Sequence, residues 1–156
     1  MAKRKKVLDD PVFGKLVFDS LWDGRVRVEP FGEIAVLIDA GAKDDPPTDA
    51  QRQAVIELQE RMPQLIGAVH QAIYKYYCDH RDQYVELAFD PEEDTPVLSS
   101  VDEVNKVLQS PPLLVVQSHR QRELPELKLR WNVTFDLEHS LYVALIGSEL
   151  QQVGIE

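Results

Sequence analysis

A chain of 156 residues, 44% of them hydrophobic, is long enough to bury the core of one domain. Its 27 acidic residues outnumber its 17 basic residues, and the resulting formal charge of −10 argues against nucleic-acid binding, which depends on neutralising phosphates. No apolar run approaches the ~18 residues that a membrane span needs, and the single cysteine, Cys78, cannot form an internal disulfide. We therefore predict a cytoplasmic protein that binds neither nucleic acid nor a membrane.

The first ten residues, 1–10, are predicted to form a flexible basic arm, because Lys3, Arg4, Lys5 and Lys6 follow one another there. The remainder, 11–156, is predicted to form a single domain. Without these four residues the chain holds 13 basic against 27 acidic residues, a formal charge of −14. Such a charge attracts a basic partner and speeds its encounter, although it also serves simply to keep a protein soluble.

Three strands are predicted after the arm. Alternation of apolar and charged residues is clearest in the second strand, where Val26 and Val28 share one face. Turn signals at Asp23-Gly24 and at 30–32 separate the strands, and connections this short predict an antiparallel meander. The predicted strands cover 12–19, 25–29 and 33–39.

A long amphipathic helix is predicted over residues 48–80. Thr48 and Gln51 have the spacing of a capping box at its start. Pro63 interrupts the pattern, so we expect a kink or a short break near Met62. The predicted apolar stripe consists of Ala54, Leu58, Met62, Leu65, Ile66, Val69, Ala72, Ile73, Tyr76 and Tyr77.

Beyond the helix, the pattern predicts a strand at 84–90, an acidic loop at 91–96 and a short helix that begins after Ser100. A second meander is expected to follow. The fold class is therefore α+β: a single domain with antiparallel β meanders on either side of a long kinked or broken helix that packs on the sheet. The strands of the second meander are predicted at 113–117, 127–135, 141–146 and 150–155.

One cluster of residues has the chemistry of a metal site or of proton transfer. Asp136, Glu138 and His139 lie within four positions, and His119 is a further candidate ligand. Neighbours on a strand or turn point in different directions, so a turn capped by a structural carboxylate explains the same residues. The metal-dependent enzyme remains an alternative function.

A second candidate for chemistry is Cys78, which lies two positions before His80 and could be an activated nucleophile. Cys78 also fits as a small core residue beside the apolar stripe. The chain contains no GxGxxG, GxxxxGK[ST], HExxH or CxxC motif. We therefore predict no cofactor and favour a function other than catalysis.

Two acidic loops are the predicted partner-binding sites, since exposed carboxylates can pair with Arg and Lys of another protein. The leading hypothesis is a protein-binding module that occludes a basic partner. A third reading is self-association through the polar face of the strand at 127–135, which carries Lys128, Arg130 and Asn132. The predicted partner-binding residues are Asp44, Asp45, Glu92, Glu93 and Asp94.

Several short motifs resemble a bacterial family of small α+β domains of unknown function. They are a Phe-Gly-x-Leu opening at 13–16, a Trp-x-Gly turn at 22–24, a helix that starts Pro-x-x-x-Gln at 47–51 and ends near Tyr76-Tyr77, and a Glu-His turn at 138–139. Relatives of this kind are associated with immunity proteins of polymorphic toxin systems. The resemblance implies an immunity-type protein and assigns no catalytic residue. The family's usual glycine after Glu-His is Ser140 here.

Overall fold

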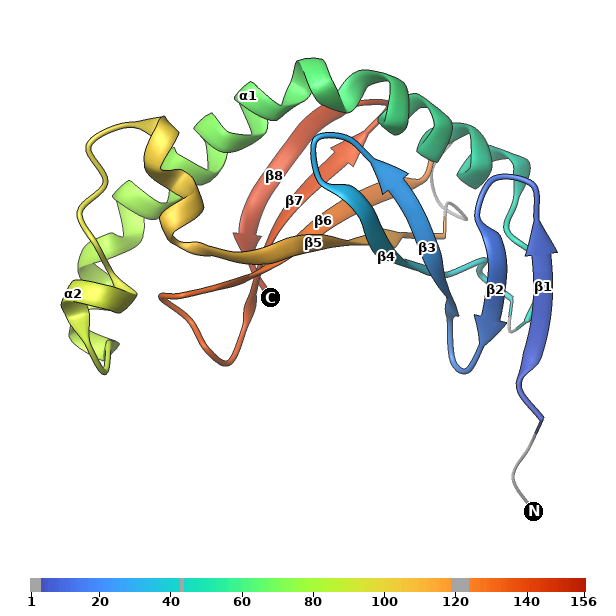
Figure 1. Cartoon of the computed structure of the whole chain (residues 1–156), viewed down its shortest axis with the longest axis horizontal. Helices are drawn as coiled ribbons and strands as arrows, with labels where there is room; N and C mark the ends of the chain where they lie inside the picture. Colours follow the sequence, from blue (N-terminus) through green and yellow to red (C-terminus); the bar gives the residue numbers. More distant parts are fainter. Residues whose placement is uncertain (1–3, 43, 119–123) are drawn as a thin grey trace.

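The computed structural model describes residues 4–42, 44–118 and 124–156 (Figure 1). Within these residues, one mixed sheet is accompanied by a long helix and two short helical segments. The elements are β1 (Lys6–Asp10), β2 (Gly14–Phe18), β3 (Trp22–Val28), β4 (Gly32–Ile38), α1 (Asp49–Leu87), α2 (Pro91–Asp94), the 3-10 helix η1 (Val101–Lys106), β5 (Leu108–Val116), β6 (Glu126–Val133), β7 (Ser140–Ile146) and β8 (Glu149–Ile155).

The strands lie in the sheet in the order of the sequence, β1 to β8. All neighbours are antiparallel except β4 and β5, which are parallel. Parallel neighbours need a long crossover connection, and here α1, α2 and η1 together supply it. The two predicted meanders are therefore real, but they form one sheet. The parallel seam pairs Val36 with Leu114, Leu37 with Val115, and Ile38 with Val116.

The start of α1 is the predicted capping box. The Thr48 hydroxyl accepts a hydrogen bond from the Gln51 amide at 3.2 Å, and the Gln51 side chain accepts one from the Thr48 amide at 3.0 Å. These reciprocal bonds satisfy backbone donors that a helix N-terminus otherwise leaves free. The buried face of α1 follows the predicted stripe from Leu58 to Tyr77 and extends it to the first turns: Gln51, Val55, Leu58, Met62, Val69, Ile73 and Tyr77.

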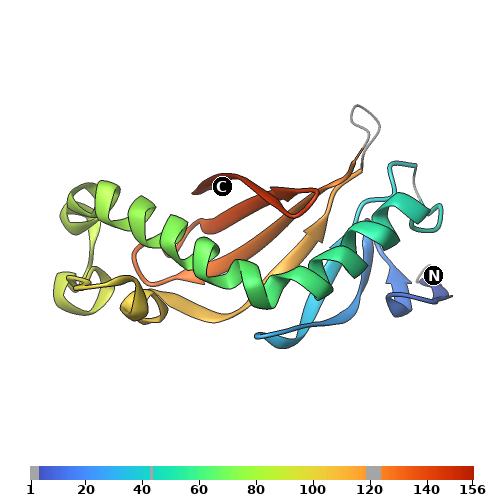
Figure 2. The same ribbon diagram turned by 90° about the horizontal axis from the view of Figure 1, so that it is seen from above.

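α1 runs through Pro63 without a break. The helix is continuous from Asp49 to Leu87, and both views show a bent axis that follows the curvature of the sheet (Figure 1, Figure 2). Pro63 is exposed, so the backbone bond that it removes lies on the solvent side of the helix. The expected alternative of a break near Met62 is therefore wrong, and Pro63 lies within a single helix.

Two features of the N-terminal half differ from prediction. Residues Lys6–Asp10, expected in a flexible arm, form β1 and pair with β2. Gly24, expected in a turn, lies inside β3, and a β-carbon on it would sit 2.6 Å from Cδ2 of Leu16. The glycine is therefore needed for the close approach of two strands and not for a change of direction.

The region after α1 also differs. Residues 84–90 were predicted as a strand, yet the helix continues to Leu87, because Tyr84 still follows Tyr77 at helical spacing. The acidic segment expected as a loop contains the single turn α2, and β5 begins at Leu108, ahead of the strand predicted at 113–117.

The hydrophobic core lies between α1 and one face of the sheet. Alternate residues of each strand point into it, as the buried positions Leu127, Leu129, Trp131 and Val133 of β6 illustrate. The intervening residues of β6 point to the opposite face, and neither view shows a helix of the described residues on that face (Figure 1, Figure 2).

Candidate functional site

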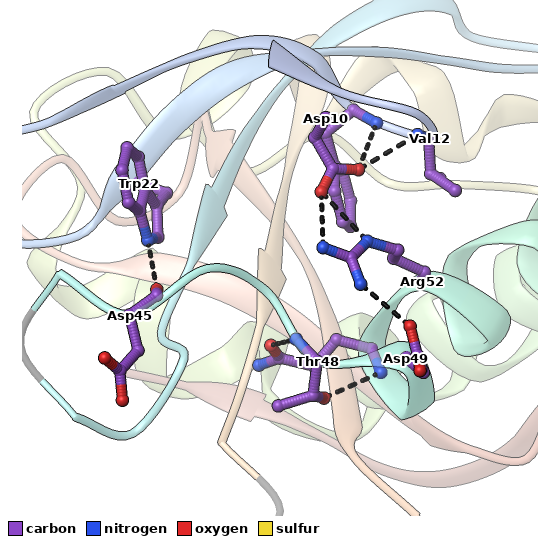
Figure 3. Close-up of polar contacts among 9 residues, drawn as sticks. Asp10, Val12, Trp22, Asp45, Thr48, Asp49 and Arg52 are labelled. Carbon is purple, nitrogen blue, oxygen red and sulfur yellow. Dashed lines mark hydrogen bonds and ion pairs between the residues drawn. The ribbon is translucent and has the colours of Figure 1, made fainter. Parts of the chain in front are cut away.

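A buried ion pair fixes the first turn of α1 against the β1–β2 turn (Figure 3). The side chain of Asp10 is only 1% exposed and accepts hydrogen bonds from the amides of Val12 (2.9 Å) and Phe13 (3.1 Å). The Arg52 guanidinium donates to the same carboxylate at 2.9 and 2.8 Å and to Asp49 at 2.8 Å. Burial raises the pKa of Asp10, but the bonds from Arg52 and the two amides outweigh it and hold the pKa below its usual range.

Other residues of the same region tie the loop before α1 to the sheet. The Trp22 indole donates to the Asp45 carbonyl at 2.7 Å (Figure 3). The buried Gln51 amide donates to the carbonyls of Asp39 (2.6 Å) and Gln117 (3.0 Å), which follow β4 and β5. The donors and acceptors of this network are used within the fold. We conclude that it builds the junction between helix and sheet.

A cleft of about 420 Å³ lies at the opposite end of α1, between the end of the helix and the turn that joins β6 to β7. Its base is aromatic: Phe135 is buried, and its ring centroid lies 4.7 Å from that of Tyr84 and 5.1 Å from that of Tyr77. The Thr134 hydroxyl donates to the Asp94 carbonyl at 2.8 Å and joins the two walls. The cleft is lined by Tyr84, Leu87, Ala88, Phe89, Asp94, Thr134, Phe135, Asp136, Leu137, Glu138 and His139.

The rim of this cleft carries three large apolar side chains that the fold leaves in solvent. Leu87 is 82% exposed, Phe89 99% and Leu137 79%. An isolated exposed leucine needs no explanation, but a cluster at a cleft is typical of an interaction site. Sequence analysis missed these residues, because Leu87 and Phe89 fell in the strand predicted at 84–90 and Leu137 in the turn at 136–139.

The same cleft brings together residues that the sequence analysis treated as separate candidates. Asp94, from the second acidic loop, lines it beside Asp136, Glu138 and His139. Asp136 caps its own turn: one carboxylate oxygen accepts the amides of Glu138 (3.1 Å) and His139 (3.0 Å). The His139 ring nitrogen Nδ1 lies 3.1 Å from that oxygen. This is the arrangement expected of the capped turn.

The geometry of the described residues does not support the hypothesis of a metal site at the 136–139 turn. No group of three or more His, Cys, Asp or Glu side chains that could hold an ion occurs in residues 4–42, 44–118 and 124–156. His119, the proposed additional ligand, lies outside the described residues.

The two acidic loops do not form one surface. Asp44 and Asp45 precede α1, whereas Glu92 and Glu93 follow it, and 39 helical residues span roughly 58 Å along the axis. Figure 1 shows α2 and the loop before α1 at opposite ends of the molecule. The Asp44 carboxylate also forms an ion pair with Lys6 at 3.2 Å. Only the second loop, through Asp94, reaches the cleft.

The Cys78 and His80 side chains do not form a catalytic pair. Cys78 is exposed, so its interpretation as a core residue is wrong. The His80 ring stacks on Tyr76 with centroids 4.2 Å apart, and its Nδ1 lies 2.7 Å from the Tyr76 carbonyl oxygen.

Comparison with known proteins identifies the family. The family model described as Domain of unknown function (DUF6985) matches residues 12–155. The chain belongs to this family. The match covers β2 to β8 and therefore the cleft and the junction network apart from Asp10, which lies in β1. No curated protein and no solved structure matches the chain.

No helix in the part of the chain that the structure describes is long and apolar enough to cross a membrane.

Proposed function

We propose that this domain is a non-enzymatic protein-binding module whose cleft receives a basic, partly apolar segment of a partner protein. The observation that carries the proposal is the position of three nearly fully exposed apolar side chains beside carboxylates at one cleft. Leu87, Phe89 and Leu137 would lose water on binding, which is favourable in proportion to the apolar area removed from solvent.

Charge around the cleft favours a basic segment. Asp94 and Glu138 line it, and Glu92 and Glu93 are exposed on α2 immediately before Asp94. Carboxylates in this setting attract Arg and Lys and accept hydrogen bonds from them. A net charge of −10 adds to the attraction at longer range.

The binding of a probe peptide tests the cleft directly. A short fluorescent peptide in which Arg alternates with Leu is titrated with the full chain at low salt, and we expect saturable binding that weakens as salt is added. Phe89→Ser and Leu137→Ser should each weaken it about tenfold or more, since both remove exposed apolar contacts without touching the core. Val7→Ser is the matched control, because Val7 is 55% exposed on β1 at the other end of the molecule. If wild type, both cleft variants and the Val7→Ser control all bind the peptide equally well, the cleft is not the peptide-binding site.

We infer further that the domain acts in the bacterial cytoplasm as an immunity-type protein, whose cleft would occlude a basic toxin. This rests on the family-like motifs of the sequence together with the acidic cleft. A pull-down with wild type and the Phe89→Ser variant, washed at low and then high salt, tests it. A basic toxin retained by wild type alone and released by salt would support the inference. A basic partner without toxic activity would refute the immunity role and leave the binding role intact.

A further inference from the structure

Among the described residues, the Nε of Arg130 has no hydrogen-bond partner, in contrast to other half-buried basic groups. Arg52 and Lys128, whose side chains are 22% and 17% exposed, are paired with Asp10 and Glu156. Arg130 is half-buried on β6, and its Nε is inaccessible to solvent without any hydrogen-bond partner among the described residues. A buried donor left unsatisfied destabilises the fold, so this arrangement needs an explanation.

The Arg130 side chain lines a pocket of about 200 Å³ on the face of the sheet opposite α1, together with Pro111, Leu113, Asn132 and Ser140. Arg130 and Asn132 are two positions apart on β6 and therefore share a face. Asn132 lies directly opposite Ser140 on β7, so their β-carbons are about 5 Å apart. Asn132 is exposed and Ser140 is half-buried, so both side chains are accessible to a ligand.

An irregularity in β5 helps to make room for the pocket. Pairing of β5 with β6 is interrupted between Gln109, opposite Asn132, and Leu113, opposite Arg130. Three β5 residues therefore face a single residue of β6, and two of the three are prolines, which cannot donate to the ladder. Pro111 and Leu113 contribute an apolar wall beside the guanidinium. Such a wall strengthens any ion pair formed there, because it keeps water away.

We propose that this pocket binds a small oxyanion, a phosphate or a carboxylate, through Arg130, Asn132 and Ser140. The guanidinium presents a planar fork of donors that matches two oxygens, the Asn132 amide adds NH donors, and the Ser140 hydroxyl adds another. The carboxylate of Glu156 is held by Lys128 at 3.0 Å, and no ion pair occupies Arg130 among the described residues, so its charge can attract the ligand. The site is separate from the apolar cleft and does not depend on its function.

Backbone amide NMR of the full chain tests the proposal with two probes, inorganic phosphate and succinate, each added against sodium chloride of equal ionic strength. We expect saturable shifts of the amides at Arg130, Asn132 and Ser140 with at least one probe. The probe that binds more tightly tells whether the ligand is a tetrahedral phosphate or a planar carboxylate. If neither phosphate nor succinate shifts these amides more than sodium chloride of equal ionic strength does, the proposal is overturned.

Three variants separate recognition by Arg130 from a general effect of charge. Arg130→Gln should lower the affinity for the tighter-binding probe by about tenfold or more. Arg130→Lys should also lower it, because lysine keeps the charge but lacks the planar fork of guanidinium donors. Lys15→Gln removes the same charge from an exposed residue of β2 and should leave the affinity unchanged. The native amide spectrum of each variant confirms folding. If Arg130→Lys and Arg130→Gln both bind like wild type, the pocket is not the site.

Discussion

The ring of Tyr142 on β7 lies against the backbone of Gly154, its partner on β8. A β-carbon added to Gly154 would sit 2.9 Å from the phenolic oxygen and 3.1 Å from two ring carbons. Lys128, from β6, places its Nζ 4.6 Å from the centroid of the same ring and also pairs with Glu156. Neighbouring side chains therefore hold Tyr142 in place, and the glycine provides the space beneath it.

Gly154→Ala should lower the free energy of unfolding by about 1–3 kcal/mol, because the ring must move and gives up its contact with Lys128. Urea unfolding of both proteins measures the difference. Gly67→Ala is the control: Gly67 lies in α1 with nothing within 4 Å of an added β-carbon, so alanine there should stabilise by about 0.5–1 kcal/mol. A Gly154→Ala variant as stable as wild type would show that Tyr142 moves at no cost.

Asp10→Asn should destabilise the protein by roughly 2–3 kcal/mol at neutral pH, since it leaves the half-buried Arg52 guanidinium without its main counter-charge. Because the pKa of Asp10 is lowered in the folded state, the carboxylate stabilises the fold fully above the unfolded pKa of about 3.9. That contribution is lost as the pH falls through the lower, folded-state pKa. The difference in unfolding free energy between wild type and Asp10→Asn should therefore shrink in strong acid.

Asp49→Asn is the matched control for Asp10, because Asp49 pairs with the same arginine from a fully exposed position. Exposed pairs contribute little, and we expect a change below about 0.5 kcal/mol. Equal effects of the two substitutions in urea unfolding would contradict the role given to the buried carboxylate.

Gln51→Glu should lower the free energy of unfolding by more than about 2 kcal/mol at neutral pH, although the side chain keeps its shape. The carboxylate cannot donate to the carbonyls of Asp39 and Gln117, and it would bring a negative charge against both oxygens. Gln53→Glu makes the same chemical change at an exposed position of α1 and should stay within about 0.5 kcal/mol of wild type. Thermal unfolding of the two variants compares them, and similar melting temperatures would be the contrary result.

Replacing Glu92 and Glu93 together by glutamine should slow association of the Arg-Leu peptide and flatten its dependence on salt, because charges at a rim act mainly on the encounter rate. Stopped-flow fluorescence measures both quantities. Asp45→Asn, at the far end of α1, is the control and should leave the rate unchanged. If Asp45→Asn slows association as much as the double variant, the encounter does not depend on the cleft.

Much of the fold follows from local signals in the sequence. The capping box at Thr48 and the stripe from Leu58 to Tyr77 fix α1, and alternation fixes strands such as β6. The strand predicted at 84–90 fails because a short stretch of alternating residues also fits the end of a long helix, and nothing local decides between the two. The parallel pairing of β4 with β5 has no local signal at all.

The candidate site was accessible to sequence analysis only in pieces. Asp94 and the turn at 136–139 were both recognised, but nothing in a linear sequence indicates that the Thr134 hydroxyl would join them. The apolar rim was hidden for a different reason. Phe89 is an ordinary hydrophobic residue by composition, and only the fold shows that its side chain is 99% exposed.

The parallel seam also bears on how the chain folds. β3 and β4 share seven paired positions across a short turn, whereas β4 and β5 share three and meet only after all of α1 has been placed between them. Closing so long a loop costs entropy before any contact repays it. We therefore expect the two sets of antiparallel strands to form early and the seam to limit the folding rate.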